Sequence, residues 1–167
     1  MSAPRSHTLH RAGTWSGAHD TVALSYDERF LRRKRLISDA GTIFFVDLPE
    51  TVSVAEGDAF ALPDGTHVAV TAAPEALLEV RGPELARLAW HIGNRHTPCQ
   101  IEPDHLLIRH DHVLADMLAR LGAELTEITA PFSPEGGAYG HGRTMGHEHG
   151  HAHGHAHPGH EHHGHEH

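Results

Sequence analysis

Histidines dominate the end of this 167-residue chain. Residues 141–167 include 12 histidines among 27 residues, most of them separated by a single residue. In an extended chain alternate side chains point the same way, about 7 Å apart, so a supple segment can bring two or more imidazoles around one ion. Neutral imidazole is a ligand of nickel, copper and zinc. The positions that this spacing predicts as metal ligands are His147, His149, His151, His153, His155, His157, His160, His162, His163, His165 and His167.

The composition of this segment excludes a packed core. Residues 141–167 contain no Leu, Ile, Val, Phe or Trp, so we expect the segment to be disordered. A purification tag has an uninterrupted histidine run, whereas no run here exceeds two residues; a solubility tail without a metal role is the other alternative. We interpret the segment as a tract that collects several metal ions with little selectivity.

A second group of histidines lies in the part of the chain that is expected to fold. His96 follows the predicted end of a helix, in a loop that solvent or a partner can reach. His110 and His112 lie two residues apart, at a strand end and a helix start. The helix dipole keeps an imidazole in the first turn neutral and able to bind metal. Asp111 between them is first a helix cap and only second a ligand. For each of the three histidines, a surface or capping role is the alternative.

Other side chains are weaker candidates. His91 falls on a predicted helix, where it does not share a face with His96. His105 lies near a turn, and His67 lies in a predicted strand as a packing or surface residue. Cys99 is a soft donor near His96, although a buried lone cysteine is more often inert.

The charge balance and the cysteine count narrow the class of protein. Asp and Glu number 22 against 13 Lys and Arg, for a net charge of −9, which disfavours a nucleic-acid-binding function. A single cysteine excludes a disulfide framework within the chain and fits a reducing compartment. No apolar run is long enough for a membrane span or a signal peptide. We therefore expect a soluble, cytoplasmic protein.

The chain contains one basic run and no enzyme motif. Residues 32–35 are four consecutive basic side chains in an acidic protein. They indicate an edge strand protected by charge, a docking patch for an acidic partner, or a nucleic-acid contact. We find no phosphate-binding loop, no His-Glu-x-x-His pattern and no Gly-x-Ser-x-Gly elbow. We therefore predict that the protein is not an enzyme.

The first half of the chain has the signals of β-structure. Residues 1–19 are polar and mixed and predict a flexible arm. Residues 20–73 predict a small all-β domain, because they lack helical periodicity and contain short runs of β-branched and aromatic residues. The expected strands are residues 21–26, 30–38, 42–46, 59–62 and 67–70, with Pro49 ending the third.

Residues 74–133 predict a second, mixed domain. A strand at 76–80 is followed by a helix from Glu84 to Gly93-Asn94, two short strands at 100–101 and 106–108, a helix capped by Asp111, and a strand at 125–128. This β-α-β-β-α-β order is the ferredoxin-like arrangement. Residues 134–167 are expected to form a linker and the histidine tail, so the fold class as a whole is α+β.

Separate motifs in the second domain resemble those of a known family. They are Gly93-Asn94-Arg95-His96 followed by Pro98, and Asp111-His112-Val113-Leu114 with Met117-Leu118 and Leu121-Gly122. Shorter pieces agree with them: Asp47-Leu48-Pro49, Glu56-Gly57-Asp58 and Asp64-Gly65. With the histidine-rich end, residues 29–167 resemble UreE, the urease accessory metallochaperones that hand nickel to urease.

The resemblance implies a fold, partners and a site. It implies a β domain similar to peptide-binding chaperone modules, a ferredoxin-like metal-binding domain, and a homodimer joined through the latter. His96 matches the histidine that, in the family, meets its dimer mate and shares one metal ion. His110 and His112 match secondary metal positions of some members.

The function implied by the resemblance is metal transfer. The cargo is Ni²⁺, for which Zn²⁺ or Cu²⁺ can substitute, and the partners are the urease accessory GTPase and the urease activation complex. A nickel or zinc buffer without a dedicated client enzyme is the alternative. A metal-dependent hydrolase is a third, disfavoured alternative, because it needs a water-bearing site with three ligands.

Overall fold

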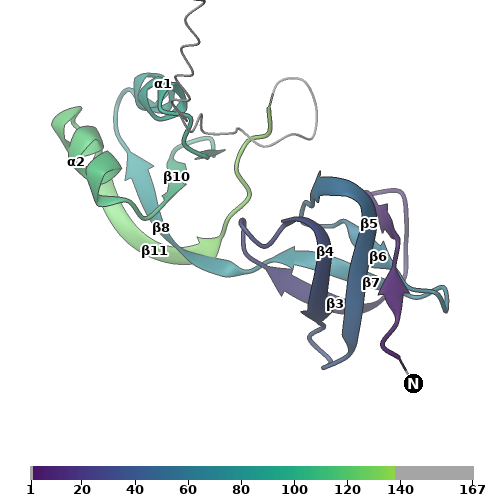
Figure 1. Ribbon diagram of the computed structural model, residues 1–167. Helices are drawn as coiled ribbons and strands as arrows, with labels where there is room; N and C mark the ends of the chain where they lie inside the picture. The colour runs from purple at the N-terminus through teal and green to yellow at the C-terminus, as the bar shows by residue number, and fades with distance from the viewer. Residues whose placement is uncertain (1, 138–167) are drawn as a thin grey trace, which may run out of the picture.

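The chain folds into two domains that lie side by side and are joined by a single connection between strands β7 and β8 (Figure 1). The computed structural model describes residues 2–137 of the chain. The predicted disorder and metal binding of the histidine tail lie outside these residues. No helix in the described part has the length and apolar character needed to cross a membrane.

The N-terminal domain consists of strands, as predicted. They are β1 (Arg5–Ser6), β2 (Thr8–His10), β3 (Ala18–Leu24), β4 (Phe30–Ile37), β5 (Ile43–Ser53), β6 (Ala59–Ala61) and β7 (His67–Ala72).

Two small sheets enclose the core of this domain. Their strand orders are β1-β5-β4 and β2-β6-β7-β3. Alternate residues of β5 and β7 point inward, namely Phe44, Val46, Val68 and Val70, and all four are almost fully buried. The ring of Phe44 lies 5.9 Å from that of Phe60 on the other sheet. Because each such buried side chain contributes about 1.5–3 kcal/mol, this apolar cluster holds the two sheets together.

The flexible arm predicted over residues 1–19 is wrong for the residues that the structure describes. Strand β1 pairs parallel to β5, with Arg5 opposite Phe45, and β2 pairs antiparallel to β6, with Thr8 opposite Ala61. Strands this short show no periodicity in the sequence, and their partners lie some forty to fifty residues away along the chain. Tertiary pairing therefore orders a segment whose local pattern looks like a loop.

The prediction that Pro49 ends its strand is also wrong, since β5 continues to Ser53. Between Asp47 and Val52 the register of β5 against β4 shifts. Proline has no N–H to donate to a ladder, and it is tolerated in a strand at such an irregularity. Pro49 lies in this irregular stretch, where β4 pairs with no residue of β5, so the absence of its N–H breaks no hydrogen bond of the ladder.

The C-terminal domain has the predicted ferredoxin-like order. Its elements are β8 (Pro74–Arg81), α1 (Leu85–Asn94), β9 (Gln100–Ile101), β10 (Leu106–Arg109), α2 (His112–Arg120) and β11 (Glu124–Pro131). The sheet order is β11-β8-β10-β9, and every neighbouring pair is antiparallel. This order places the first and last strands of the domain, β8 and β11, next to each other.

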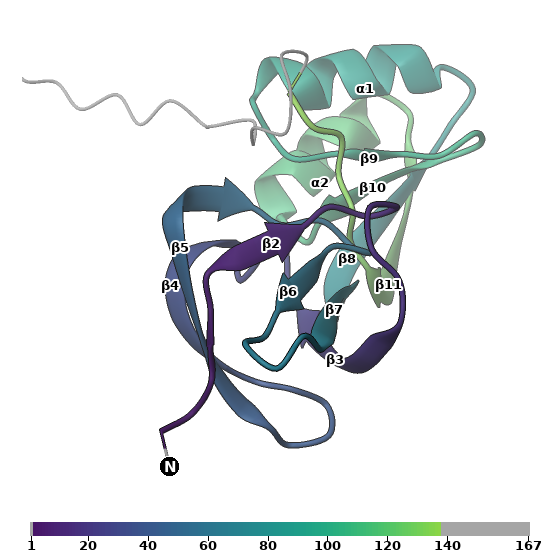
Figure 2. The ribbon, with the colours of Figure 1, turned by 90° about the vertical axis from the view of Figure 1, so that its right-hand side faces the viewer.

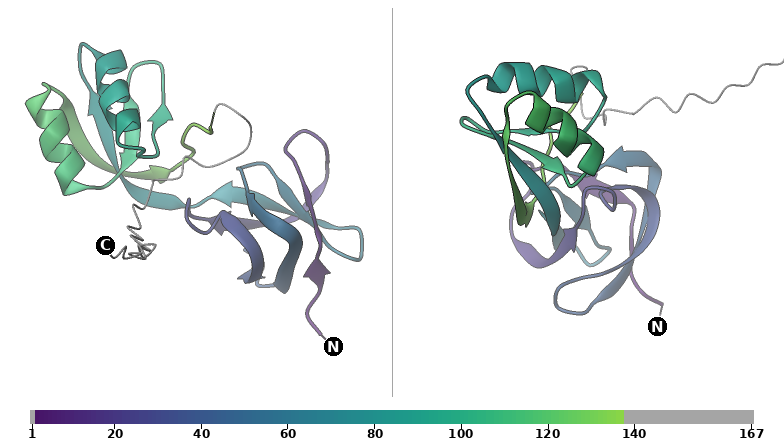
Figure 3. Two further views of the ribbon diagram at one scale, coloured as in Figure 1. Left: turned by 45° about the horizontal axis from the view of Figure 1, so that its top comes forward. Right: turned by 90° about the vertical axis from the view of Figure 1, so that its left-hand side faces the viewer.

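Both helices cover one face of this sheet (Figure 3). Leu88 and Ile92 of α1, with Leu114 and Leu118 of α2, pack with Val80 and other buried residues of the strands. The apolar spacing of each helix follows the 3.6-residue period, so one stripe is buried and the opposite side is exposed. The helices thereby fix the position of the loops that follow α1 and precede α2.

The opposite face of the sheet contributes to the junction with the N-terminal domain. Leu77, Leu107 and Phe132 form a buried cluster against which Tyr26 packs. The rings of Tyr26 and Phe132 are 5.7 Å apart in an edge-to-face arrangement. This cluster joins the segment after β11 to the N-terminal domain.

One buried cation bonds to both sides of the junction. Arg29 donates one Nη to the carbonyl oxygen of Leu24 at 2.8 Å and the other Nη to the carbonyl oxygen of Phe132. Arg29 is only 3% exposed, and a buried guanidinium without such partners would be strongly destabilising. Nearby, Arg109 of β10 donates to Asp27 at 3.0 Å.

Candidate metal centre

His96 occupies a special backbone position directly after α1. The backbone N–H of His96 donates to the carbonyl oxygen of Gly93 at 2.9 Å, and that of Thr97 donates to Ile92 at 3.4 Å. These two bonds form a Schellman motif, in which the residue after the cap adopts the left-handed conformation. His96 has a φ of 55° and is the one non-glycine residue with positive φ among those described.

The residue type at this position carries information about function. Glycine is the usual occupant because a Cβ atom in the left-handed region costs about 1 kcal/mol. Backbone strain of this kind is found at functional sites, where the surrounding structure enforces it. Here the chain has an exposed imidazole in place of glycine. The geometry therefore favours a role for the His96 side chain outside the stability of the fold.

His96 and His110 line one depression, although 14 positions separate them in the sequence. Thr97, Pro98, Arg109, Asp111 and Leu114 line it as well. The Nε2 atom of His110 lies 2.8 Å from a carboxylate oxygen of Glu127 on β11. A carboxylate on one ring nitrogen orients the imidazole and leaves the other nitrogen for a metal.

Asp111 is the helix cap that the sequence predicts. Its carboxylate accepts hydrogen bonds from the backbone N–H groups of Val113 at 2.8 Å and Leu114 at 3.0 Å. These bonds satisfy two of the donors that a helix start leaves open. His112 is the first residue of α2 and is exposed, but it is not among the residues that line the depression. The structure thus brings together two of the three predicted histidines.

The described part of one chain does not close a metal centre. Within residues 2–137, no group of three or more His, Cys, Asp or Glu side chains is arranged to hold a metal ion. Two imidazoles leave a transition-metal ion with open coordination positions. The depression can therefore serve as one part of a site whose other ligands come from elsewhere.

The segment that leads to the histidine tail returns to this loop. After β11 the chain runs back beside β9 (Figure 2). The N–H of Ser133 donates to the side-chain oxygen of Gln100 at 2.9 Å, and the N–H of Glu135 donates to the carbonyl of Cys99 at 2.9 Å. Since Cys99 is only three positions after His96, the start of the tail is held close to the candidate site.

The surroundings of two weaker candidates, His105 and Cys99, point to structural roles. His105 Nδ1 lies 2.6 Å from a carboxylate oxygen of Asp104. This contact, with the nearby Arg81, lowers the pKa of Asp104 to about 2. Burial, followed by the negative charge of Glu135, raises the pKa of the Cys99 thiol to about 11. Cys99 therefore stays protonated at neutral pH, and a protonated thiol is a poor metal ligand.

A second pair of histidines, which the sequence does not reveal, lies in the N-terminal domain. The rings of His10 and His67 are 5.1 Å apart, and the indole of Trp15 stacks on His67 at 5.4 Å. Trp15 also donates from its ring nitrogen to the carbonyl of Gly57 at 3.0 Å. The Nε2 atom of His67 is buried and has no hydrogen-bond partner in the described structure. We call His10 and His67 the closed pair, because both are partly buried and the indole covers one face of His67, whereas His96 is exposed.

Comparisons with known proteins match both domains. Residues 3–73 match the model of the N-terminal domain of the UreE urease accessory protein, and residues 75–167 match the model of its C-terminal domain.

Individual relatives agree over most of their length. The urease accessory protein UreE of Ruegeria pomeroyi is 60% identical over 149 residues, which cover 89% of this chain and 100% of the relative. That of Rhodobacter capsulatus is 60% identical over 145 residues, or 87% of this chain and 92% of the relative. That of Paracoccus denitrificans is 66% identical over 123 residues, or 74% and 79%. With both domains matched and the predicted motifs in place, this chain belongs to the UreE family of urease accessory proteins.

Proposed function

We propose that this protein is a nickel metallochaperone that collects Ni²⁺ and delivers it to urease during assembly of the urease active site. Its membership of the urease accessory family supports a role in urease assembly. Nickel as cargo follows from the family resemblance and from the imidazole-rich ligand set. The protein performs no bond-breaking step, because its task is to hold an ion and release it.

The observation that carries the proposal is the exposed His96 in a left-handed backbone position. An imidazole there is costly for the fold, and it lines the same depression as His110. A carrier needs a site that binds its ion and remains open to a recipient. The incomplete ligand set within residues 2–137 supports such an open site.

A two-fold axis near His96 supplies the missing ligands in our proposal. A residue close to such an axis meets its own copy, so a homodimer places two His96 imidazoles on one ion. His110 and His112 act as secondary ligands from the same region. The ion then lies between subunits, where a change in the dimer or the arrival of a recipient can release it.

The tail acts as the collector. His147 follows Glu135 by 12 positions, and such a segment spans at most about 40 Å. The Glu135–Cys99 hydrogen bond holds the start of this segment three residues from His96. Tail imidazoles at high local concentration can therefore pass Ni²⁺ to the interface site. Ordinary imidazoles become protonated as the pH falls through about 6.5, so binding by the tail weakens on acidification.

The recipients in this proposal are the urease accessory GTPase and the urease activation complex. For nitrogen ligands Cu²⁺ binds more tightly than Ni²⁺, so docking to these partners and metal availability provide the selectivity. The single cysteine fits a reducing compartment, and we place the transfer in the cytoplasm.

Calorimetric nickel titration separates the carrier from a metal buffer. The proteins are the full chain and a chain ending at residue 140, each with and without His96→Ala. The hydrophobic clusters of both domains lie within residues 2–137, so the shortened chain retains its cores. The carrier predicts about one ion per two shortened chains, and loss of that ion in His96→Ala. If all binding is lost with the tail, the protein is a buffer.

A further inference from the structure

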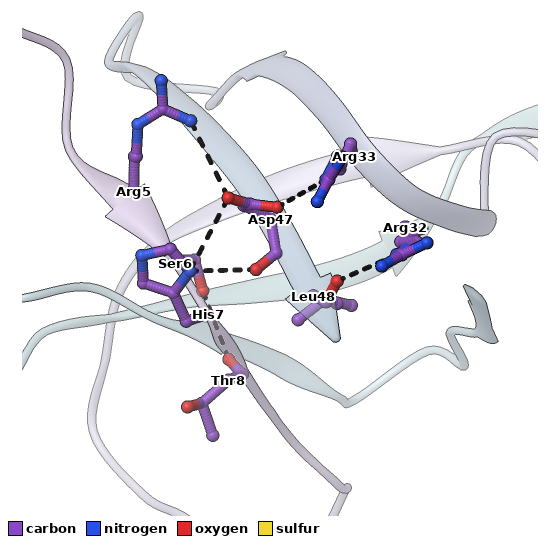
Figure 4. Close-up of polar contacts among 8 residues, drawn as sticks. All are labelled: Arg5, Ser6, His7, Thr8, Arg32, Arg33, Asp47 and Leu48. Atoms are coloured by element: carbon purple, nitrogen blue, oxygen red, sulfur yellow. Dashed lines mark hydrogen bonds and ion pairs between the residues drawn. The ribbon is translucent and has the colours of Figure 1, made fainter. Parts of the chain in front are cut away.

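The exposed face of the sheet β1-β5-β4 carries a cluster of cations that the metal site does not use. Strand register places Arg5 and Arg35 opposite Phe45, and Arg33 opposite Asp47. Residues paired across neighbouring strands point to the same side of a sheet. Alternate residues of β5 point to the core, so these five side chains lie on the outer side. We call these five residues the basic face; Figure 4 shows three of them, Arg5, Arg33 and Asp47.

Asp47 orders the arginines without neutralising the face. Its carboxylate accepts a hydrogen bond from Arg33 Nε at 2.8 Å and lies 4.0 Å from Arg5. The Arg33 contact is the main cause of the lowered pKa of Asp47, which therefore carries its charge at neutral pH. Arg5 also stacks over the Phe45 ring, 5.3 Å from its centroid. Three arginines against one carboxylate leave two net positive charges in a chain of net charge −9.

Arg35 is the arginine most available to a ligand. Its side chain is exposed and forms no ion pair or hydrogen bond with another residue of the described part. Arg33 is also exposed, with 69% of its side chain accessible, and it uses Nε alone for the bond to Asp47. The Arg33 guanidinium, held in place by this bond, can bind a carboxylate with little further loss of conformational entropy.

Apolar side chains continue the same face. Ile37 lies opposite Ile43 in the β4–β5 register, two positions beyond the Arg35–Phe45 pair. Ile37 is 53% exposed and Ile43 is 40% exposed. Large apolar residues grouped beside arginines are typical of protein–protein contacts. A ligand for this face therefore combines negative charge with apolar side chains.

Edge protection explains only part of this pattern. Strands β1 and β4 are the two edge strands of their sheet, and charges on an edge strand prevent unwanted pairing. However, exposed isoleucines, such as Ile37 on β4 and Ile43 on β5, do not protect an edge. Lys34 points to the opposite side of β4, where its ammonium lies 3.9 Å from Glu28. The cations on the outer side thus remain for another purpose.

We infer that the basic face docks an extended acidic segment of a partner protein, whose carboxylates bind Arg33 and Arg35 and whose apolar side chains contact Ile37 and Ile43. A protein ligand fits better than a polyanion, because nucleic acid and anionic membranes are repelled by the net charge of −9 over larger distances. A short segment touches only the face itself. The face belongs to the N-terminal domain, so this docking is separate from metal binding at the His96 loop.

The test uses the full chain with metal chelated. A fluorescein-labelled peptide of alternating Glu and Val is titrated by fluorescence anisotropy, at low and at raised salt. A peptide of alternating Lys and Val, a labelled oligo-dT strand and phosphatidylserine vesicles are the comparison ligands. The variants are Arg33→Glu and Arg35→Glu. The matched control is Arg87→Glu, which reverses an exposed arginine of α1 in the other domain.

We expect the Glu-Val peptide to bind, and binding to weaken at raised salt. Each reversal on the basic face weakens binding at least about tenfold, whereas Arg87→Glu changes it less than about twofold. Amide chemical shifts of β4 and β5 move on titration. The inference is overturned if Arg87→Glu causes an equal loss, if oligo-dT or the vesicles bind more tightly than the peptide, or if the peptide does not bind.

Discussion

The two histidine pairs of this protein are built in opposite ways. In the closed pair, the rings of His10 and His67 lie 5.1 Å apart, the indole of Trp15 stacks on His67, and the Nε2 atom of His67 is buried without a hydrogen-bond partner among the described residues. His96 and His110 line an open depression at the edge of the other domain. Closeness of imidazoles is therefore a poor guide to metal binding in this chain. His96 and His110, the open pair, differ from the closed pair in being accessible to an ion and to a recipient protein.

The backbone supports the same distinction. The strained residue is His96, in the open pair, with its φ of 55°. His10 and His67 are in regular strands and pack as ring systems. Ring packing contributes to stability at the closed pair, whereas the open pair includes a residue whose backbone conformation is strained. The following predictions test this difference.

Removal of the Trp15 indole, which stacks on His67 of the closed pair, has the largest expected effect on stability. Trp15→Ala loses the stacking on His67 and the hydrogen bond to Gly57. We expect the free energy of unfolding to fall by about 2 kcal/mol, measured by urea denaturation of the chain ending at residue 140. Trp15→Phe, which keeps an aromatic ring over His67, restores most of the loss. A loss of nickel binding by the His96 region in Trp15→Ala would contradict the separation of the two pairs.

His67→Phe is expected to stabilise the closed pair. The buried Nε2 atom of His67 lacks a partner among the described residues, and an apolar ring of similar shape removes that unsatisfied group. We expect a gain of about 1 kcal/mol in unfolding free energy. His19→Phe, at an exposed position, is the control and should give no gain. Nickel titration should give the same number of bound ions for His67→Phe and the parent protein, and a loss of nickel binding in His67→Phe would contradict the separation of the two pairs.

His96→Gly tests whether the backbone of the open pair is strained. Glycine relieves the left-handed strain, so we expect a gain of up to about 1 kcal/mol in stability together with loss of nickel binding at this site. His96→Ala also loses the metal but keeps the strain, so its melting temperature should match that of the parent protein. If His96→Gly lowers the melting temperature, the side chain has a structural role and the strain argument is wrong.

The smallest expected effect on stability is that of Asp104, whose carboxylate is hydrogen-bonded to the His105 ring. The pKa of Asp104 in the folded protein is about 2, against a usual 3.8. A lowered pKa means that Asp104 stabilises the fold above about pH 4, and that this contribution is lost as the pH falls towards 2. Asp104→Asn should therefore lower the melting temperature slightly at pH 7, and the difference from the parent should shrink below pH 4. A difference that is the same at both pH values would contradict this assignment.

Local patterns predicted the C-terminal domain well. Asp111 before an apolar stripe indicates a cap, and it caps α2 in the structure. The order of strands and helices gives the ferredoxin-like arrangement because each element has a clear period or break. The family motifs around His96 were recognised for the same reason, since they lie in one continuous stretch.

The features that the sequence did not reveal depend on distant contacts. The pairing of Arg5 with Phe45 orders a segment with no pattern of its own. The stacking of Trp15 on His67 and the burial of Arg29 between the domains join residues that are far apart in the chain. His96 and His110 line the same depression only because α1, β10 and α2 pack together. Side-chain partners of this kind are not encoded in local periodicity.

Native mass spectrometry of the chain ending at residue 140, with limiting nickel, measures whether His96 holds one ion shared between two copies. We predict a species of two chains with one nickel ion, and its absence in His96→Ala, while His67→Phe retains it. A nickel-bound species of a single chain, or an unchanged two-chain species in His96→Ala, would contradict the claim.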